Sequence, residues 1–490
     1  MYKIKLGYDS LLLTYSNYER FGDIVQKVFS LPGYDQGDYV HEWEKQAGNQ
    51  HIFCKTKNEI ENEFNIKFPV HLNESQTLFN SLFLENTYNF CCTDIALLRR
   101  MQEVELIEDT VDNFLDRDEE FIYPYSVINE KFFTVDIPLP PNRVIEAVKQ
   151  GKAKIVFFYG AEGHTYNIGK IKKLVEFTKK IGVEVHYYHS NLKLSEAYEQ
   201  WKKIIPNQTT HKLKVHRFSA FEVDPWCVRL DRTNNYNVKA LESSYHKKVN
   251  EHRVTKNVIN PNNLKKFLIF NRRPRLYRKL IHAAVMSDDN LKINSYTGIE
   301  NNIHLDEQIS LYQAKSDHLY HGKRIFNYID KNREQYKNNG YELDVNLNEN
   351  QAFNFPLSFY YNSLISVVTE TETHKDCVFF TEKIFKAILG LHPFIMITSP
   401  YFLQTLKDEG YQTFDRFWDE SYDLIEDDDL RFSAVLKLIE DLNTKSIFEL
   451  TEMYFEMKDV LQYNYYHFIH NSRHINYLRS LEEFKGIGLI

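Results

Sequence analysis

The 490-residue sequence contains few cysteines, and they are Cys54, Cys91, Cys92, Cys227 and Cys377. Their odd number and wide spacing in so long a chain argue against a disulfide framework and favour a reducing compartment. No cysteine pair has the spacing to histidine partners that a zinc site requires. The sequence therefore predicts no structural metal.

The sequence also lacks long apolar runs and an excess of basic residues. No run of about 18 apolar residues occurs, and the N-terminal segment MYKIKLGYDS has no apolar core of a signal peptide. These absences predict a cytoplasmic protein without a membrane span. The net charge of −8 gives no global basic field for nucleic acid, so binding to DNA would require a local basic groove.

The residues that are present indicate an α/β protein of two or three domains. Hydrophobic residues make up 43% and charged residues 26% of the chain, which is typical of globular proteins. Between residues 150 and 222 an apolar run, Ala153 to Tyr159, predicts a buried strand. Helical spacing follows from Ile168 to Lys180, and Val183 to Tyr188 is predicted to be the next strand. This order predicts part of a doubly wound domain.

The loop Gly160 to His164 follows the first of these strands. A carboxylate at the carboxyl end of a central strand is where α/β sheets commonly place chemistry. Transfer of a group to a hydroxyl needs a base, and Glu162 fits by position, with His164 as the second candidate. In the alternative interpretation the glycines only make a tight turn and Glu162 caps the next helix.

A second strand, loop, helix and strand unit lies within residues 364–398. Leu364 to Val368 and Phe394 to Ile397 are apolar runs of strand length, and the spacing of the apolar residues from Ile384 to Leu389 is helical. Pro393 precedes the second strand, and Ser399-Pro400 predicts the start of another helix. The polar residues between the first strand and the helix fall where ligands bind in parallel sheets.

Thr381, Glu382 and Lys383 begin the predicted helix. A helix N-terminus suits a phosphate or a polyol. Glu382 has the chemistry to accept hydrogen bonds from ribose hydroxyls, and Lys383 or Lys386 to neutralise a phosphate. In the alternative interpretation Thr381 is an ordinary N-cap and Glu382 complements the helix dipole.

An arginine-rich turn follows the strand predicted at Lys265 to Phe270. It reads Asn271-Arg272-Arg273-Pro274-Arg275, and Pro274 suits the first turn of a helix. Arginines at a helix start oppose its dipole, and a diphosphate between them would reverse this conflict through bidentate hydrogen bonds. The alternative is an exposed basic turn paired with acidic neighbours.

These blocks resemble a known family. Phe379 to Lys383, followed by an apolar helix and His392-Pro393-Phe394, is similar to the donor-binding signature of fucosyltransferase-like glycosyltransferases. Glu370-Thr371-Glu372 stands where that family carries Glu-Asn-Ser. The wider set resembles glycosyltransferase-like proteins of bacteriophages and covers about residues 263–431. Its further blocks are the arginine-rich turn, Ser295-Tyr296-Thr297-Gly298, Thr413-Phe414 and Trp418 to Asp423.

The resemblance implies the GT-B arrangement of two doubly wound, Rossmann-like domains. Residues 1–262 would form the acceptor-side domain, with its Rossmann-like core at about 150–222 and an irregular or helical N-terminal region. Residues 263–490 would form the nucleotide-sugar-binding domain, with closing helices at its end. The implied donor-binding residues are Arg272, Arg273, Arg275, Tyr296, Glu370, Thr371, Glu372, Thr381, Glu382, Lys383 and Lys386.

The implied activity is transfer of a sugar from a nucleotide-sugar to a hydroxyl acceptor, such as a glycan, without a cofactor. Cationic side chains would stabilise the leaving diphosphate without a metal. Retaining enzymes of this fold carry a glutamate eight residues before the one corresponding to Glu382, and His374 stands there, which favours inversion. Two alternatives stay open. One is a phage enzyme that glycosylates hydroxymethylated DNA bases in the host cytoplasm, and the other is a non-catalytic binding protein. The sequence carries no signal for an oligomeric state.

Overall fold

The computed structural model describes residues 2–8, 104–126, 137, 139–159, 168–204, 212–217, 264–302, 304–306, 316–341 and 357–486. The chain divides into two compact units. The first unit comprises Met1–Ala220 together with Tyr477–Ile490, and the second comprises Phe221–Asn476. The division falls near residue 220, and the end of the chain groups with the first unit. The boundary predicted at residue 262 lies outside the described residues.

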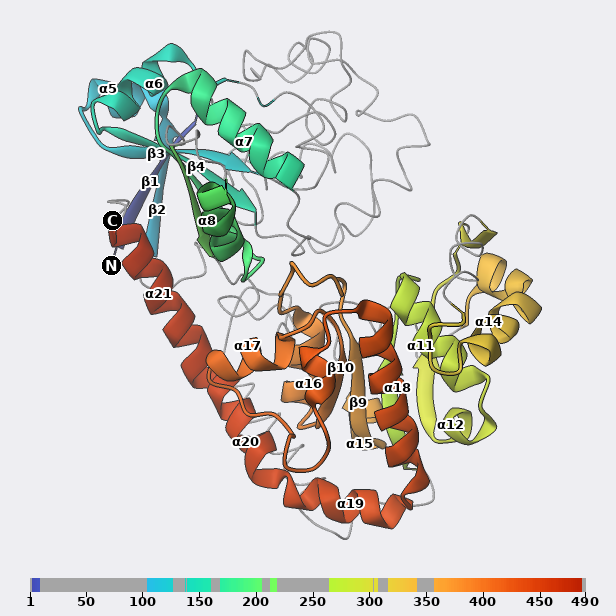
Figure 1. Ribbon diagram of the computed structural model, residues 1–490. Coiled ribbons are helices and arrows are strands. Elements are labelled where there is room, and N and C mark those ends of the chain that lie inside the picture. The colour runs from blue at the N-terminus through green and yellow to red at the C-terminus, as the bar shows by residue number, and fades with distance from the viewer. Residues whose placement is uncertain are drawn as a thin grey trace, which may run out of the picture. The chain divides into compact units, whose positions relative to one another are not determined.

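The first unit contains a six-stranded parallel sheet in the order β2-β1-β3-β4-β5-β6 (Figure 1). Its strands are β1 (Tyr2–Tyr8), β2 (Val104–Thr110), β3 (Phe121–Ser126), β4 (Ala153–Tyr159), β5 (Val185–His189) and β6 (Leu213–Arg217). The helices described in this unit before the chain's last helix are α5 (Val111–Asp116), α6 (Asn142–Lys149), α7 (Ile168–Ile181) and α8 (Leu194–Ile204).

Aromatic packing fills the core of the first unit. Tyr125 of β3 stacks on Phe157 of β4 with ring centroids 4.4 Å apart, and Phe177 of α7 packs edge-on against both rings. The last helix, α21 (Arg473–Gly486), adds Phe484, which is fully buried and lies 5.3 Å from the ring of Tyr188. The C-terminal residues thus complete the core of the first unit.

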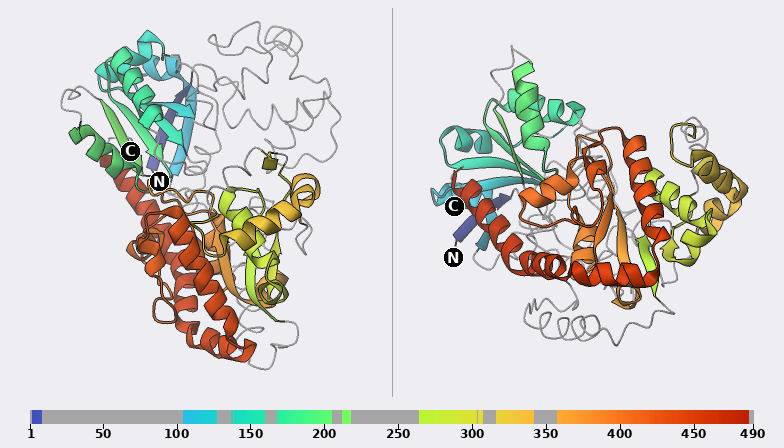
Figure 2. Two further views of the ribbon diagram at one scale, coloured as in Figure 1. Left: turned by 45° about the vertical axis from the view of Figure 1, so that its right-hand side comes forward. Right: turned by 60° about the horizontal axis from the view of Figure 1, so that its bottom comes forward.

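The second unit contains a four-stranded parallel sheet in the order β10-β9-β7-β8 (Figure 2). Its strands are β7 (Lys265–Phe270), β8 (Ser295–Gly298), β9 (Ser363–Thr369) and β10 (Phe394–Ile397). The helices between these strands are α11 (Leu276–Met286), α12 (Asp289–Ile293), α14 (Gly322–Lys331), the π-helix η6 (Gln335–Asn339), α15 (Leu357–Tyr361) and α16 (Glu382–Leu389).

After β10 the second unit continues as helices. They are α17 (Phe402–Asp408), the 3-10 helix η8 (Ser421–Leu424), α18 (Asp428–Thr444), α19 (Ile447–Glu456), α20 (Lys458–Tyr466) and the π-helix η9 (His467–Ser472). Within this unit α11 and α18 lie on one side of the sheet, and α16 and α17 lie on the other (Figure 1). Right-handed crossovers that run in opposite directions produce this arrangement.

The α/β class and the parallel sheets predicted from the sequence are confirmed. The apolar runs at Ala153–Tyr159, Lys265–Phe270 and Phe394–Ile397 form strands over those same residues, and most of their described side chains are buried. The N-terminal region was expected to be irregular or helical, and where it is described, up to residue 120, it forms the strands β1 and β2 and the short helix α5. Alternate residues of β1, Ile4 and Leu6, are fully buried, which stabilises an extended chain.

Candidate functional site

The connections of the second sheet diverge between β7 and β9. The chain leaves β7 through α11 toward β8, whereas it leaves the neighbouring β9 through α16 toward β10. In open α/β sheets, ligands bind outside the carboxyl ends of two strands whose connections diverge in this way. The residues after β7 and β9 therefore form the candidate site, and they include most of the donor-binding residues predicted from the sequence.

The turn after β7 presents two exposed arginines. Arg272 donates from Nε to Glu300 Oε1 at 2.9 Å, and the Glu300 backbone N–H donates to the Arg272 carbonyl oxygen at 3.0 Å. Arg273 is exposed and makes no ion pair with any residue that the structure describes. The turn thus presents the guanidinium of Arg272, which Glu300 orients, and that of Arg273, which makes no ion pair with a described residue.

Two further arginines join this turn to the end of β9. Arg275 donates from Nη1 to the Thr371 carbonyl oxygen at 2.9 Å and to Glu372 Oε1 at 3.1 Å. Arg278, in the first turn of α11, donates from Nη2 to the Thr369 carbonyl oxygen at 3.3 Å. These contacts hold the two loops side by side, as the alternative interpretation of a basic turn with acidic partners expects.

A buried carboxylate stands between β9 and α16. Glu370 is 2% exposed, and its Oε2 accepts a hydrogen bond from the Thr381 hydroxyl at 2.6 Å. The same hydroxyl oxygen accepts from the Lys383 backbone N–H at 3.1 Å, so Thr381 is the N-cap of α16. Burial raises the pKa of Glu370, an effect that the nearby Lys383 charge reduces. The predicted N-cap is confirmed, and it is itself held by Glu370.

Lys383 and Glu382 form an ion pair in the first turn of α16. Lys383 Nζ lies 2.9 Å from Glu382 Oε1 and 3.9 Å from Glu370 Oε2. Burial by itself would raise the pKa of Glu382, but the charges of Lys383 and Lys386 outweigh it, and the pKa lies below its usual value. Glu382 is therefore an ionised acceptor at neutral pH, and its side chain remains 14% exposed.

Several buried polar atoms at this edge of the sheet have no hydrogen-bond partner among the described residues. They are both amide atoms of Asn271 after β7, the Thr369 hydroxyl and Glu370 Oε1 at the end of β9, and the Ser399 hydroxyl after β10. An unpaired buried polar atom costs about 1–3 kcal/mol. Such atoms are rare in protein interiors, and here they belong to three neighbouring strands at the edge where ligands bind.

The structure brings most of the predicted donor-binding residues into one chain of direct contacts. It runs from Arg275 to Thr371 and Glu372, and then from Glu370 through Thr381 to Lys383 and Glu382. Lys386 is buried one turn further along α16.

Tyr296 lies elsewhere, with its ring packed 5.0 Å from Phe359 of α15. Glu162 and His164 lie outside the described residues. Sequence reasoning did not single out Glu300 and Arg278, although each stands just beyond a strand that leads to this edge.

The other blocks that carry the family resemblance have structural roles. His392 is fully buried, pairs with the Ser366 hydroxyl at 2.9 Å and lies 2.7 Å from the Tyr360 carbonyl oxygen. Asp423 accepts from the backbone N–H of Leu403 at 3.0 Å, and Glu420 accepts from that of Phe414 at 2.9 Å. These residues stabilise the loops around the sheet and do not join the network at its carboxyl edge.

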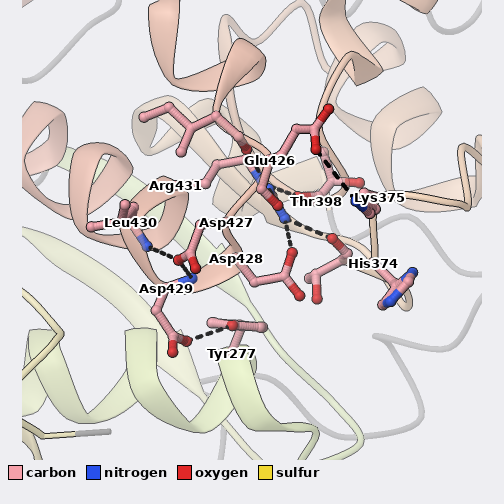
Figure 3. Close-up of polar contacts among 12 residues, drawn as sticks. Tyr277, His374, Lys375, Thr398, Glu426, Asp427, Asp428, Asp429, Leu430 and Arg431 are labelled. Carbon is pink, nitrogen blue, oxygen red and sulfur yellow. Dashed lines mark hydrogen bonds and ion pairs between the residues drawn. The ribbon is translucent and has the colours of Figure 1, made fainter.

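A polar depression of about 440 Å³ lies beside α18, lined by His374, Lys375, Glu426, Asp427, Asp428 and Asp429 (Figure 3). Each carboxylate there already has a partner. Asp427 caps α18 through the N–H groups of residues 429 and 430, and Asp428 pairs with Arg431. Asp429 accepts from the Tyr277 hydroxyl, and Glu426 pairs with Lys375.

The acidic cluster is thus a helix cap with side-chain ion pairs. Among the described residues, no group of three or more His, Cys, Asp or Glu side chains is arranged to hold a metal ion.

Comparison with known proteins returns no match to the chain, neither among models of protein families nor among curated proteins. In the part of the chain that the structure describes, no helix combines the length and apolarity needed to cross a bilayer.

Proposed function

We propose that the protein is a glycosyltransferase that moves a sugar from a nucleotide-sugar donor to a hydroxyl acceptor, and that the second unit binds the donor. The observation that carries the proposal is the contact chain between the two helix starts at the diverging strands β7 and β9. It assembles guanidinium, ammonium and ionised carboxylate groups at the edge where open α/β sheets bind nucleotides.

Each part of a nucleotide-sugar has a suitable partner in this arrangement. The guanidinium of Arg273 is exposed, and that of Arg272 is held through one nitrogen only. The side chain of Lys383 is 25% exposed. These three cations suit a diphosphate. Glu382, ionised and partly exposed, suits the paired hydroxyls of a ribose. The end of β9, with Glu370 to Glu372, would face the sugar.

The reaction that follows from this proposal is a single displacement. Glu162, or His164 in its place, takes the proton of the acceptor hydroxyl. The hydroxyl oxygen then forms a bond to the anomeric carbon as the bond to the diphosphate oxygen breaks, and the configuration is inverted. The leaving nucleoside diphosphate carries the departing electron pair, and Arg272, Arg273 and Lys383 stabilise its charge without a metal.

A binding screen followed by an activity assay tests the proposal. Nucleoside diphosphates and their sugars are tested for a rise in melting temperature, which a ligand that binds the folded state produces. We expect a rise for the ligands of one base, its loss in Glu382→Gln, and its retention in Glu146→Gln. Glu146 is a matched control because it pairs with Lys149 at 2.7 Å on α6, in the first unit.

The outcomes separate the alternatives. Release of nucleoside diphosphate with a hydroxyl acceptor, lost in Glu162→Gln while the binding shift persists, supports the enzyme. Binding without release under any acceptor supports a non-catalytic binding protein. Release only with hydroxymethylated DNA, weakening steeply with salt, supports the DNA-modifying alternative. No shift with any nucleotide or nucleotide-sugar overturns the proposal.

A further inference from the structure

The pair formed by Arg272 and Glu300 joins two neighbouring strands of the second sheet. Arg272 follows the end of β7 and Glu300 follows the end of β8, and the two residues meet at two points. The side chains meet through Nε and Oε1 at 2.9 Å, and the Glu300 N–H donates to the Arg272 carbonyl oxygen at 3.0 Å. Because the backbone contact fixes Glu300 relative to Arg272, the carboxylate approaches the guanidinium from a defined direction.

The atom that Arg272 uses for this contact is informative. A guanidinium has one Nε–H and a fork of two Nη groups, and the fork matches the spacing of oxygens in carboxylates and phosphates. Glu300 engages Nε, and neither Nη of Arg272 makes a hydrogen bond or ion pair with any other residue that the structure describes. Arg275 differs, because its Nη1 donates hydrogen bonds to the Thr371 carbonyl oxygen and to Glu372 Oε1. Arg272 is therefore oriented without using its fork.

We propose that Glu300 is a positioning residue for phosphate recognition, which holds Arg272 by Nε so that its Nη fork is free for the diphosphate of the donor. This inference rests on the proposed function. The Arg272 side chain is 42% exposed, so without Glu300 it would sample several rotamers in water. Holding it in one orientation before the ligand arrives removes part of the ordering cost of binding.

The charge of Glu300 acts in the opposite direction. A carboxylate beside the site repels an anionic ligand, although exposure of this pair to solvent weakens the repulsion. A glutamine keeps an oxygen that accepts from Nε and removes the charge, whereas an alanine removes both. The two substitutions therefore separate orientation from charge, and a purely electrostatic role of Glu300 would make both variants bind the diphosphate more tightly.

Titration calorimetry with inorganic pyrophosphate, UDP, GDP and ADP tests the inference. We expect Glu300→Ala to weaken the dissociation constant of the diphosphate that wild type binds by about threefold to tenfold, the range for ordering one long side chain. Glu300→Gln should bind within twofold of wild type or more tightly. In an Arg272→Ala background, Glu300→Ala should have no further effect, because the residue acts only through Arg272.

Three results would overturn the inference while leaving the proposed function intact. The first is unchanged or tighter diphosphate binding by Glu300→Ala. The second is equal weakening of binding by Glu300→Ala and Glu300→Gln. The third is that Glu300→Ala weakens binding as much in the Arg272→Ala background as it does in the wild-type protein. Absence of binding of every diphosphate and nucleotide-sugar to the wild-type protein would instead overturn both. Melting temperatures of all variants within two degrees of wild type show that the comparison concerns folded protein.

Discussion

Replacement of Thr381 by valine is expected to destabilise the start of α16. Valine has nearly the shape of threonine but no hydroxyl, so the hydrogen bonds of the hydroxyl to Glu370 and to the backbone N–H and Nζ of Lys383 are lost at once. The cap of the Lys383 N–H at 3.1 Å disappears, which costs about 0.5–2 kcal/mol. The 2.6 Å donation to the buried Glu370 Oε2 also disappears, and an unpaired buried acceptor costs about 1–3 kcal/mol. Together these losses amount to about 1.5–5 kcal/mol.

Hydrogen exchange of the α16 amides measures this loss directly. Since about 1.4 kcal/mol is a factor of ten, local exchange in Thr381→Val should quicken by about 10-fold to 4000-fold. Thr381→Ser keeps the hydroxyl and should change exchange much less. Ser446→Ala on α19 is the matched control, because it removes an exposed cap without a buried carboxylate behind it, and it should cost only about 0.5–2 kcal/mol.

The reasoning also predicts how Thr381 depends on Glu370. In a Glu370→Gln background the buried charge is absent, so Thr381→Val should cost less than it does in the wild-type protein. A quickening of less than threefold in Thr381→Val, or equal effects of the valine and serine substitutions, would refute the assignment of this hydroxyl as the link between Glu370 and α16.

Four other expectations follow from the buried contacts and charges of the two units. Burial raises the pKa of Glu370 above 4.5, so the folded state keeps this proton up to a higher pH than the unfolded state does. The free energy of unfolding therefore falls as pH rises between 4.5 and the higher pKa, and Glu370→Gln should remove this slope. The lowered pKa of Glu382 has the reverse effect, with stability lost as pH falls below 4.5, and Glu382→Gln should remove that loss. Arg431→Lys should speed hydrogen exchange in residues 373 and 398–399, because Nη2 and Nε donate at 2.6 and 2.7 Å to carbonyl oxygens of residues 373 and 398. Phe484→Ala should destabilise the first unit by about 3–5 kcal/mol in denaturant unfolding, and no loss there would contradict the packing of α21 against Tyr188.

Sequence patterns predicted the regular elements well where the signal is local. The apolar runs of β4, β7 and β10 are short, continuous and bounded by turn residues, and each strand forms over the predicted residues. The helix α7 follows its apolar spacing to within one residue of the prediction. Thr381 as an N-cap was predicted by its place before an acidic first turn, and its hydroxyl caps α16.

Predictions were wrong where a distant residue supplied the interaction. Ser399-Pro400 was expected to start a helix with its own N-cap. The helix α17 instead begins at Phe402, and the Asp423 side chain accepts from the backbone N–H groups of Leu403 and Gln404 at 3.0 and 3.1 Å.

The sequence by itself determined the elements of this protein, its α/β class and the polar residues that follow β7 and β9. Hydrophobic periodicity and capping depend on residues a few positions apart, so they can be read along the chain. The tertiary structure decided which of those polar residues meet. Arg275 reaches Glu372 across 97 positions, and Glu300 holds Arg272 across 28. Such pairs depend on strand order and register, because a parallel sheet brings the carboxyl ends of distant segments to one edge, and no local pattern encodes that order.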